Sequence, residues 1–364
     1  MTSRAAVVLS ACLLAAPSAA QPQPQWERAR VETRAVTGGL EKAFRAIAAE
    51  HAEAAWIGYA LAAAPGAGQS CCGSRGEWGC CRLEKETGLS IRQDEDSKER
   101  LTTGRVKLEG PEFFWVLLRV ENRHVGRIAA CSEGCELDAG GLRVVWLTGV
   151  TPEESVALLS VYATSGATEE DDHRSGKGLR NHAVMAIALH GDAAADRALE
   201  NFVAASRPET LRREAAFWMG VARGARGFET LRRMVKEDPS EDVREHVIFA
   251  LSQSKRPGAI ATMIDAARND RSSRVRGQAL FWLAQRAGAR AAGVITDAIE
   301  NDPETEVKKK AVFALSQLPK DEGVPRLIQV ARSNRNPAVR KQAVFWLGQS
   351  NDPRALAFFE EVLK

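Results

Sequence analysis

The sequence is poor in the residues and motifs that most often carry catalysis. Its 364 residues include only 6 histidines and 2 tyrosines. No G-x-S-x-G turn, no Walker-type phosphate loop and no G-x-G-x-x-G after a predicted strand occurs. Gly176-Lys177-Gly178 lacks the upstream glycine and the following hydroxyl residue of a phosphate loop. We therefore predict a protein that is not an enzyme and that needs no cofactor.

Long apolar runs are also scarce. The run Ala5–Ala16 is too short to span a bilayer. Arg4 precedes it and small residues end at Ala20, so residues 1–20 read as a signal peptide. We expect an exported protein, periplasmic or extracellular, with no transmembrane segment in the mature chain. A lipid anchor at Cys12 is the less expected outcome, because the apolar run continues past that residue.

Neither sign of charge dominates the whole chain, whose formal net charge is +3. From Lys177 onward, however, 31 lysines and arginines stand against 23 acidic residues. This excess could attract an acidic partner. It is modest for so long a surface, so we do not expect nucleic-acid binding.

What the sequence does contain is a repeat of 32 residues. The clearest copy is Val275–Gln285, and related segments begin at Leu179, Leu211, Val243, Val307 and Val339. A fixed period of this length indicates stacked repeats that each bury a face against the next. We predict an α-solenoid of about six helix pairs over residues 178–364.

Apolar spacing within one copy indicates a helix that is buried on two sides. Val275, Ala279, Trp282 and Leu283 form one stripe, and Phe281 points elsewhere. The seventh residue after each start alternates between tryptophan and alanine, which suits large-against-small packing between repeats. An exposed aromatic binding ladder is the other interpretation. Second helices are expected at 260–267, 294–299, 324–331 and 356–363.

These paired helices, with an Asp-Pro turn and a Val-Arg opening, resemble PBS-lyase HEAT-like repeats. The resemblance implies a ladder of hydrogen bonds in which an aspartate of the turn and an arginine after the valine bind neighbouring repeats. The matching residues here are Asp238, Arg244, Asp270, Arg276, Asp302, Lys308 and Arg340, with Asn334 and Ser206 in the aspartate position at the ends.

Residues 21–165 are expected to form a small α+β head, and 166–177 a linker. A helical pattern runs from Leu40 to Ala64, and the capping box Thr151–Glu154 begins another helix. Strands are expected at 105–109, 113–120, 125–130 and 142–150, most simply in an antiparallel sheet.

Six cysteines of the mature chain lie in this head: Cys71, Cys72, Cys80, Cys81, Cys131 and Cys135. An even number after export favours structural disulfides, whose pairing the sequence does not determine. A metal site and a redox-active pair at Cys131 and Cys135 are the alternatives, although the spacing matches neither a zinc ribbon nor C-x-x-C. We predict no bound metal.

These observations favour a non-catalytic scaffold that binds a protein or peptide partner. The expected polar contacts, if second helices line the concave side as in relatives, are Arg232, Arg233, Lys236, Arg268 and Arg332. Alternatives are an enzyme related to bilin lyases or to other HEAT-repeat enzymes, and a metal- or redox-binding head. Deoxyhypusine hydroxylase holds iron with His-Glu pairs near the starts of such helices, and no His-Glu pair occurs here.

Overall fold

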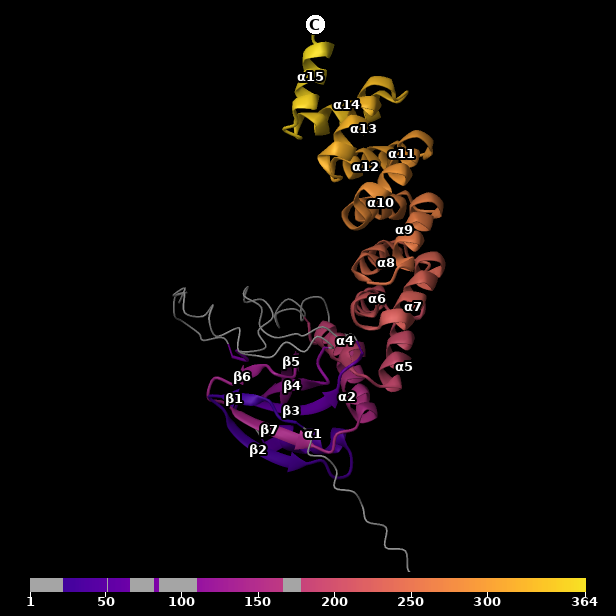
Figure 1. Ribbon diagram of the computed structural model, residues 1–364. Coiled ribbons are helices and arrows are strands. Elements are labelled where there is room, and N and C mark those ends of the chain that lie inside the picture. The colour runs from indigo at the N-terminus through magenta and orange to yellow at the C-terminus, as the bar shows by residue number, and fades with distance from the viewer. Residues whose placement is uncertain (1–21, 51, 66–81, 85–109, 166–177) are drawn as a thin grey trace, which may run out of the picture.

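The computed structural model describes residues 22–50, 52–65, 82–84, 110–165 and 178–364. Within them the chain forms a head that contains a β-sheet and a curved stack of helix pairs that rises from it (Figure 1). The predicted fold class, an α-solenoid with a small α+β head, is confirmed. The predicted signal peptide (1–20), the predicted linker (166–177) and Cys71, Cys72, Cys80 and Cys81 lie outside the described residues, as does the strand expected at 105–109.

The head is built on a five-stranded sheet of order β2-β7-β3-β4-β5. Its strands are β2 (Arg30–Ala35), β3 (Ala55–Ala62), β4 (Phe113–Glu121), β5 (His124–Ser132) and β7 (Arg143–Thr148). The sheet is mixed, because β7 runs parallel to both β2 and β3, whereas β3, β4 and β5 are antiparallel. The expectation of an antiparallel sheet is therefore only half right. The short strands β1 (Gln25–Glu27) and β6 (Glu136–Asp138) form a second, parallel pair.

The helix expected over Leu40–Ala64 is wrong in its second half. Helix α1 ends at Glu50 (Leu40–Glu50), and residues Ala55–Ala62 form the central strand β3. A strand that is buried on both faces reads as a continuous apolar run, which short patterns cannot distinguish from a helix. Tyr59 faces the core shared with α1, while Trp56 lies in the core on the other face of the sheet.

The helix α2 (Pro152–Thr164) joins the head to the solenoid. It begins with the predicted capping box, in which the Thr151 hydroxyl accepts from the Glu154 amide and the Glu154 carboxylate accepts from the Thr151 amide. It packs on α1 and on the first helix pair of the solenoid. Buried side chains therefore continue from the head into the repeats as one hydrophobic core.

Six helix pairs make up the described solenoid, each with a first helix that carries the repeated sequence and a second helix behind it. The first helices are α4 (Leu179–Leu189), α6 (Glu209–Ala222), α8 (Glu241–Gln253), α10 (Ser273–Ala287), α12 (Thr305–Ser316) and α14 (Pro337–Gly348). The second helices are α5 (Ala193–Phe202), α7 (Gly224–Glu237), α9 (Gly258–Asn269), α11 (Ala292–Asn301), α13 (Lys320–Ser333) and α15 (Pro353–Val362).

The two layers of helices differ in how closely they pack. Successive first helices contact one another extensively, whereas successive second helices touch at few positions. Gly220 shows how close the inner packing is, since a Cβ atom there would lie 2.4 Å from the Ala250 carbonyl oxygen. The closely packed layer must lie on the inside of the curve. Figure 1 accordingly shows α6, α8, α10 and α12 in the column that faces the head, with α7, α9 and α11 on the outer side.

Candidate functional site

Buried ion pairs connect consecutive repeats. Arg212, Arg244 and Arg276 each bind, with two nitrogens, the carboxylate 26 residues ahead, on Asp238, Asp270 and Asp302 respectively. The nitrogen–oxygen distances lie between 2.7 and 3.1 Å. A third nitrogen of each arginine donates to a carbonyl of its own turn, as Arg244 does to Asp238. Bidentate pairing with every buried group satisfied is a packing device, so this ladder holds the stack together.

The ladder changes character at its C-terminal end. Lys308 donates to the Glu300 carbonyl at 2.6 Å instead of reaching the next turn. Asn334 takes the aspartate position and donates to the Glu300 carboxylate at 3.2 Å. Arg340 donates to carbonyls of its own turn, those of Asn334 and Arg335. The bidentate rungs therefore run from Arg212 to Asp302.

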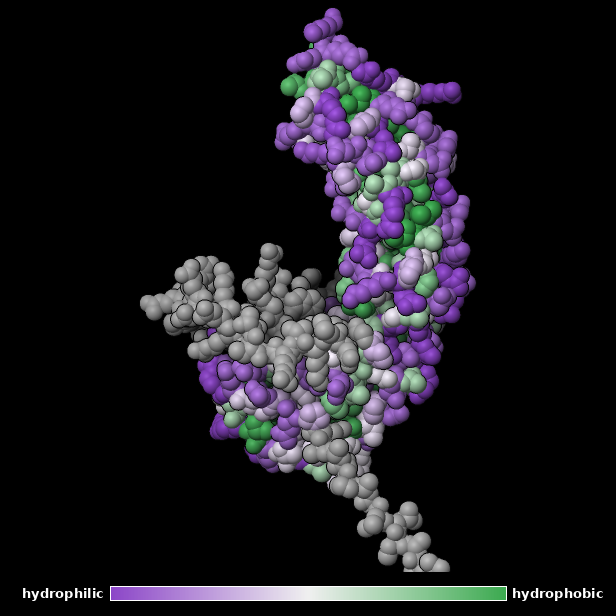
Figure 2. Space-filling view, in the orientation of Figure 1, coloured by the Kyte–Doolittle hydropathy of each residue, from purple (hydrophilic) through white to green (hydrophobic). Residues whose placement is uncertain are grey.

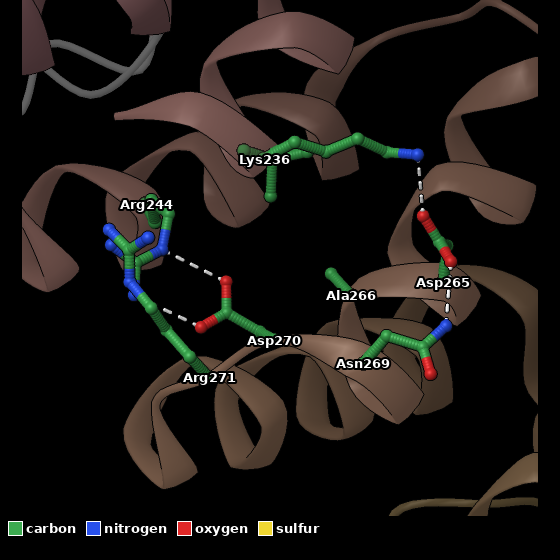
Figure 3. Close-up of a pocket in the computed structure, with 8 residues that line it drawn as sticks. Lys236, Arg244, Asp265, Ala266, Asn269, Asp270 and Arg271 are labelled. Carbon is green, nitrogen blue, oxygen red and sulfur yellow. Dashed lines mark hydrogen bonds and ion pairs between the residues drawn. The ribbon is translucent and has the colours of Figure 1, made fainter. Parts of the chain in front are cut away.

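A cavity of about 380 Å³ lies between α7, α9 and the turn that follows α9 (Figure 3). Lys236 and Asp265 face each other across it at 2.9 Å, and Asn269 donates to the same carboxylate. The Lys236 ammonium, followed by the Asn269 amide, lowers the pKa of Asp265. Arg271 donates to the carbonyls of Asp238 and Pro239. Each charged side chain that lines this cavity thus has a partner within the chain, and the arrangement resembles no catalytic site.

The residues expected to contact a partner lie on second helices. Arg232, Arg233, Lys236, Arg268 and Arg332 all belong to second helices, and Figure 1 places α7 and α9 away from the head. The expectation that second helices line the concave side does not hold for this chain.

Most of these outer cations are also paired with acidic residues. Lys236 binds Asp265, Arg268 approaches Asp297 at 3.8 Å, and Arg332 binds Glu361, so each joins its own second helix to the next. Arg232 binds Glu229 within α7. Lys236, Arg268 and Arg332 therefore link neighbouring second helices through surface ion pairs.

Partly exposed aromatic rings follow one another along the first helices instead. We call Phe217, Phe249, Phe281, Phe313 and Phe345 the aromatic row. Phe217 stacks on Phe249 with ring centroids 5.6 Å apart, and Phe281 stacks on Phe313 at 5.8 Å. Trp282 and Trp346 tilt onto the phenylalanine of the preceding repeat, at 4.9 and 4.8 Å. The alternating alanines, Ala250 and Ala314, are fully buried. The alternation is therefore compatible with packing, while the phenylalanines remain accessible.

A second row runs beside the aromatic one. Gln253, Gln285, Gln317 and Gln349 occupy the tenth position after each repeat start and are exposed. We call them the glutamine row. The Gln285 amide reaches the Gln317 carbonyl oxygen at 3.4 Å, so the row is continuous between α10 and α12. The space-filling view shows apolar residues exposed along the repeats and bordered by hydrophilic ones (Figure 2).

A buried chain of hydrogen bonds crosses the junction between head and solenoid. Tyr59 on β3 and His190 at the end of α4 each lie 2.9 Å from the hydroxyl oxygen of Ser155 on α2. Burial lowers the pKa of His190 to about 4, so the ring is neutral at pH 7. A serine beside a histidine can mark a nucleophile. All three side chains are inaccessible to substrate, however, and we interpret this network as structural. No sequence signal identified it.

Cys131 and Cys135 are the two described members of the cysteine set, and both are buried in the second core of the head. Cys135 is disulfide-bonded. The pairing of the whole set stays a prediction. Within the described part of the chain, no three His, Cys, Asp or Glu side chains gather as a metal site would require. No helix there is long and apolar enough to cross a membrane.

Comparison with known proteins identifies HEAT repeats at residues 197–284 and 293–364. The match covers most of the helix stack and less than half of the chain. The comparison with curated protein sequences found no match.

Several solved structures are similar to the solenoid. One is the complex of CpcE and CpcF of phycocyanin lyase from Nostoc, with 24% identity over 43% of this chain and 99% of that chain, and a TM-score of 0.33. Human deoxyhypusine hydroxylase shows 18% identity over 58% and 90%, with a TM-score of 0.25. Yeast importin-beta shows 15% identity over 57% and 33%, with a TM-score of 0.37. Similarity at this level does not assign an activity to the chain.

Proposed function

We propose that this chain, with its stack of HEAT repeats, is an exported, non-catalytic scaffold that binds a protein or peptide partner on the concave side of its solenoid. The observation that carries this proposal is the aromatic row. Phe345 is 53% exposed, and the other four rings are half-buried on the same helix face. Apolar groups that remain accessible in register over five repeats mark an interaction surface, whereas single exposed apolar residues do not.

Two further features support a binding role. The buried arginines and aspartates are used within the stack, and the cavity between α7 and α9 contains no unpaired ionisable group. The N-terminal pattern Arg4, Ala5–Ala16 and Ala20 supports export. Mass spectrometry of the N-terminal peptide, with protein taken from its native compartment, should then give Gln21, as glutamine or its cyclised form, as the first residue. A mature protein that still begins at Met1 would contradict export without touching the binding role.

Site-specific crosslinking tests where the partner binds. Benzoylphenylalanine in place of Phe345 on α14 is expected to give a discrete covalent adduct when the protein is irradiated in its native compartment. The same amino acid in place of Val362, which is 62% exposed on the second helix α15, serves as the matched control. Equal adducts from both positions, or none from position 345, would contradict a partner on the concave side.

A further inference from the structure

The concave side contains more than apolar surface. We propose that the aromatic and glutamine rows bind an extended, proline-containing peptide segment that has an acidic end, and that a cavity beside Trp346 takes one of its apolar side chains. This inference rests on the proposed scaffold function and adds the chemical class of the partner. Four observations carry it.

The first observation is the spacing of the rows. Packed helices lie about 8–10 Å apart, so the helices that carry the rows repeat at that interval. The rings themselves pair over two repeats, at 5.6 Å for Phe217 and Phe249 and 5.8 Å for Phe281 and Phe313. A polyproline II segment has three residues per turn and advances about 9 Å per turn. Two turns of such a segment can therefore span each pair of repeats, so that the contacts recur from one pair to the next. A β-strand, with a side-chain period of two residues, does not match this spacing so simply.

The second observation is the chemistry of the two rows. The Phe345 ring, which is 53% exposed, gives a proline ring an apolar surface, and the stacked pair of Phe281 and Phe313 adds a partly exposed one. A polyproline II backbone makes no internal hydrogen bonds, so its carbonyl groups need external donors. The exposed amides of Gln285, Gln317 and Gln349 supply donors beside the aromatic row, at one per repeat. Aromatic faces beside amide donors are what recognition of this conformation requires.

The third observation is a cavity of about 230 Å³ at the end of the glutamine row. It lies between the C-terminal ends of α12 and α14 and the start of α13. Its walls are Leu318, Val324, Leu327 and the Trp346 ring, and Gln317 and Gln349 stand at its polar side. Ser316, Lys320 and Ser350 complete its polar side. The apolar wall, which adjoins the donor row, suits one aliphatic side chain of the bound segment.

The repeat two units earlier shows why this cavity is open. Ser350 lines it, and the equivalent residue 64 positions earlier is Arg286. The Arg286 side chain crosses the corresponding gap and donates to the Ser254 carbonyl at 3.4 Å. Residue 318 is the equivalent of Ser254, so an arginine at position 350 would meet the Leu318 carbonyl. The chain thus contains both a filled and an open form of the same position.

The fourth observation is the distribution of charge along the concave side. Glu241, Asp242 and Glu245 of α8 gather around Arg274, which makes that part acidic or balanced. On α12 and α14 the position of Glu245 holds Lys309 and Lys341, and the position of Asp242 holds Glu306, which pairs with Lys309, and Ala338. The acidic end of the bound segment therefore belongs near the cavity, and its other end near α8.

Fluorescence anisotropy with a labelled probe tests this inference. The probe is a fluorescein-tagged peptide of three Pro-Pro-Leu triplets followed by two glutamates. We expect saturable binding to the full chain. The pair Gln317→Ala with Gln349→Ala, and separately Ser350→Arg, should each weaken binding at least tenfold. The pair Arg232→Ala with Arg233→Ala on the outer side should leave it unchanged.

Two controls keep the outcome interpretable. Circular dichroism melts identify any variant that loses its fold, and Ser350→Arg copies an arrangement that the chain already uses. A second probe replaces each proline by glycine and should bind at least tenfold more weakly, because its backbone is not preorganised. The inference is overturned by absent binding to the full chain, by equal binding of both probes, or by inner variants that bind as the outer control does. A crosslinked partner at position 345 that the proline probe fails to displace would leave the scaffold function standing and reject this inference.

Discussion

The proton positions in the junction network follow from its geometry. The His190 Nδ1 atom lies 2.8 Å from the Ala186 carbonyl, which can only accept, so Nδ1 carries the proton. Nε2 must then accept from the Ser155 hydroxyl, and the Tyr59 hydroxyl donates to the Ser155 oxygen. The three side chains thus form one chain of hydrogen bonds, in which Tyr59 donates to Ser155, Ser155 donates to His190 and His190 donates to the Ala186 carbonyl. A positively charged ring would place a second donor where this network needs an acceptor.

The stability of the protein should therefore fall in mild acid. The unfolded ring has a pKa near 6.5, while burial, more than any other cause, lowers the folded pKa of His190 to about 4. The unfolded state binds the proton more tightly, so stability is complete above pH 6.5 and decreases as the pH falls from 6.5 towards 4. The loss approaches roughly 3 kcal/mol for this one group. Urea unfolding at pH 7 and pH 5 measures it.

Histidine variants show which side chain causes the loss of stability in acid. His190→Gln should reduce the pH dependence, although it also lowers stability at pH 7. His124→Gln, at an exposed position on β5, should leave the pH dependence as it is. Burial also lowers the pKa of His246 to about 4, so part of the dependence should persist in His190→Gln. An unchanged slope in His190→Gln would contradict the assignment.

The buried ladder predicts a large effect at Arg244. Replacing Arg244 by alanine leaves the Asp270 carboxylate buried without its bidentate partner. Removal of one partner of a buried pair costs about 3–5 kcal/mol. Arg232→Ala, whose ion pair with Glu229 is exposed, should change stability by less than about 1 kcal/mol. Chemical unfolding of the two variants distinguishes these cases, and equal losses would show that the ladder is not a main source of stability.

One position of the preceding repeat distinguishes Trp218 from Trp346. Trp218 donates to Asn181, the second residue after the start of the preceding repeat. At Trp282 the equivalent residue is Glu245, whose carboxylate binds Arg274, and the indole nitrogen has no partner among the described residues. The equivalent residue before Trp346 is Lys309, which can only donate, and the Trp346 indole nitrogen is buried without a partner among the described residues. Lys309→Asn should therefore raise stability by about 1 kcal/mol. Lys341→Asn, at the same repeat position of α14, is the control, and a thermal melt that ranks both equally would refute the explanation.

At the scale of elements, the sequence determined the solenoid far better than the head. The helices predicted from Val275 and its copies are all present, because each repeats the same burial pattern with period 3.6. In the head, β2 was not predicted, since Arg30–Ala35 is an edge strand with alternating polar residues. The parallel pairing of β2 and β3 with β7 depends on contacts between segments about 90 or more residues apart. Local patterns do not encode such pairings.

The candidate site was also only partly predictable. The periodic phenylalanines and the alternating tryptophans were visible in the sequence, but which helix layer faces inward was not. That property depends on the relative spacing of two layers, and so on residues such as Gly220 that permit close approach. The cavity beside Ser350 depends on the length of one side chain compared with Arg286. Neither follows from the apolar period.

Two glycines at the same repeat position test the spacing of the inner helices. Gly220→Ala would place a methyl group 2.4 Å from the Ala250 oxygen and should destabilise the protein by about 1–3 kcal/mol. Gly348, the last residue of α14, has nothing within 4 Å of the added atom. Gly348→Ala should be neutral or stabilising by up to about 1 kcal/mol, because alanine favours the helix. Thermal melts of both variants suffice, and similar melting temperatures would exclude a tight α6–α8 contact.

The whole molecule is a one-dimensional stack on a head that shares its core. In such a stack each repeat contacts only its neighbours, so a local defect should weaken nearby elements first. Ser155 links β3, α2 and α4 through Tyr59 and His190. The distal helices α12 and α14 make no described contact with that region.

Hydrogen exchange should display this gradient. In Ser155→Ala, amides of β3, α2 and α4 are expected to exchange faster, and those of α12 and α14 at the wild-type rate. Ser333→Ala, whose hydroxyl bonds the Gln329 carbonyl on exposed α13, should leave the head unchanged. Uniformly faster exchange along the chain in Ser155→Ala would show that head and repeats unfold as one unit.

The alternation of tryptophan and alanine has a consequence for how such a chain can change in length. The smallest unit that preserves the alternation is a pair of repeats, 64 residues long, because only two consecutive repeats contain both the tryptophan and the alanine. Excising residues 243–306 would bring Trp218 next to Ala314 and preserve the order. Excising only residues 275–306 would set Ala250 beside Ala314 and leave a void where an indole belongs. Insertion or deletion of an even number of repeats should therefore preserve the packing between neighbouring repeats.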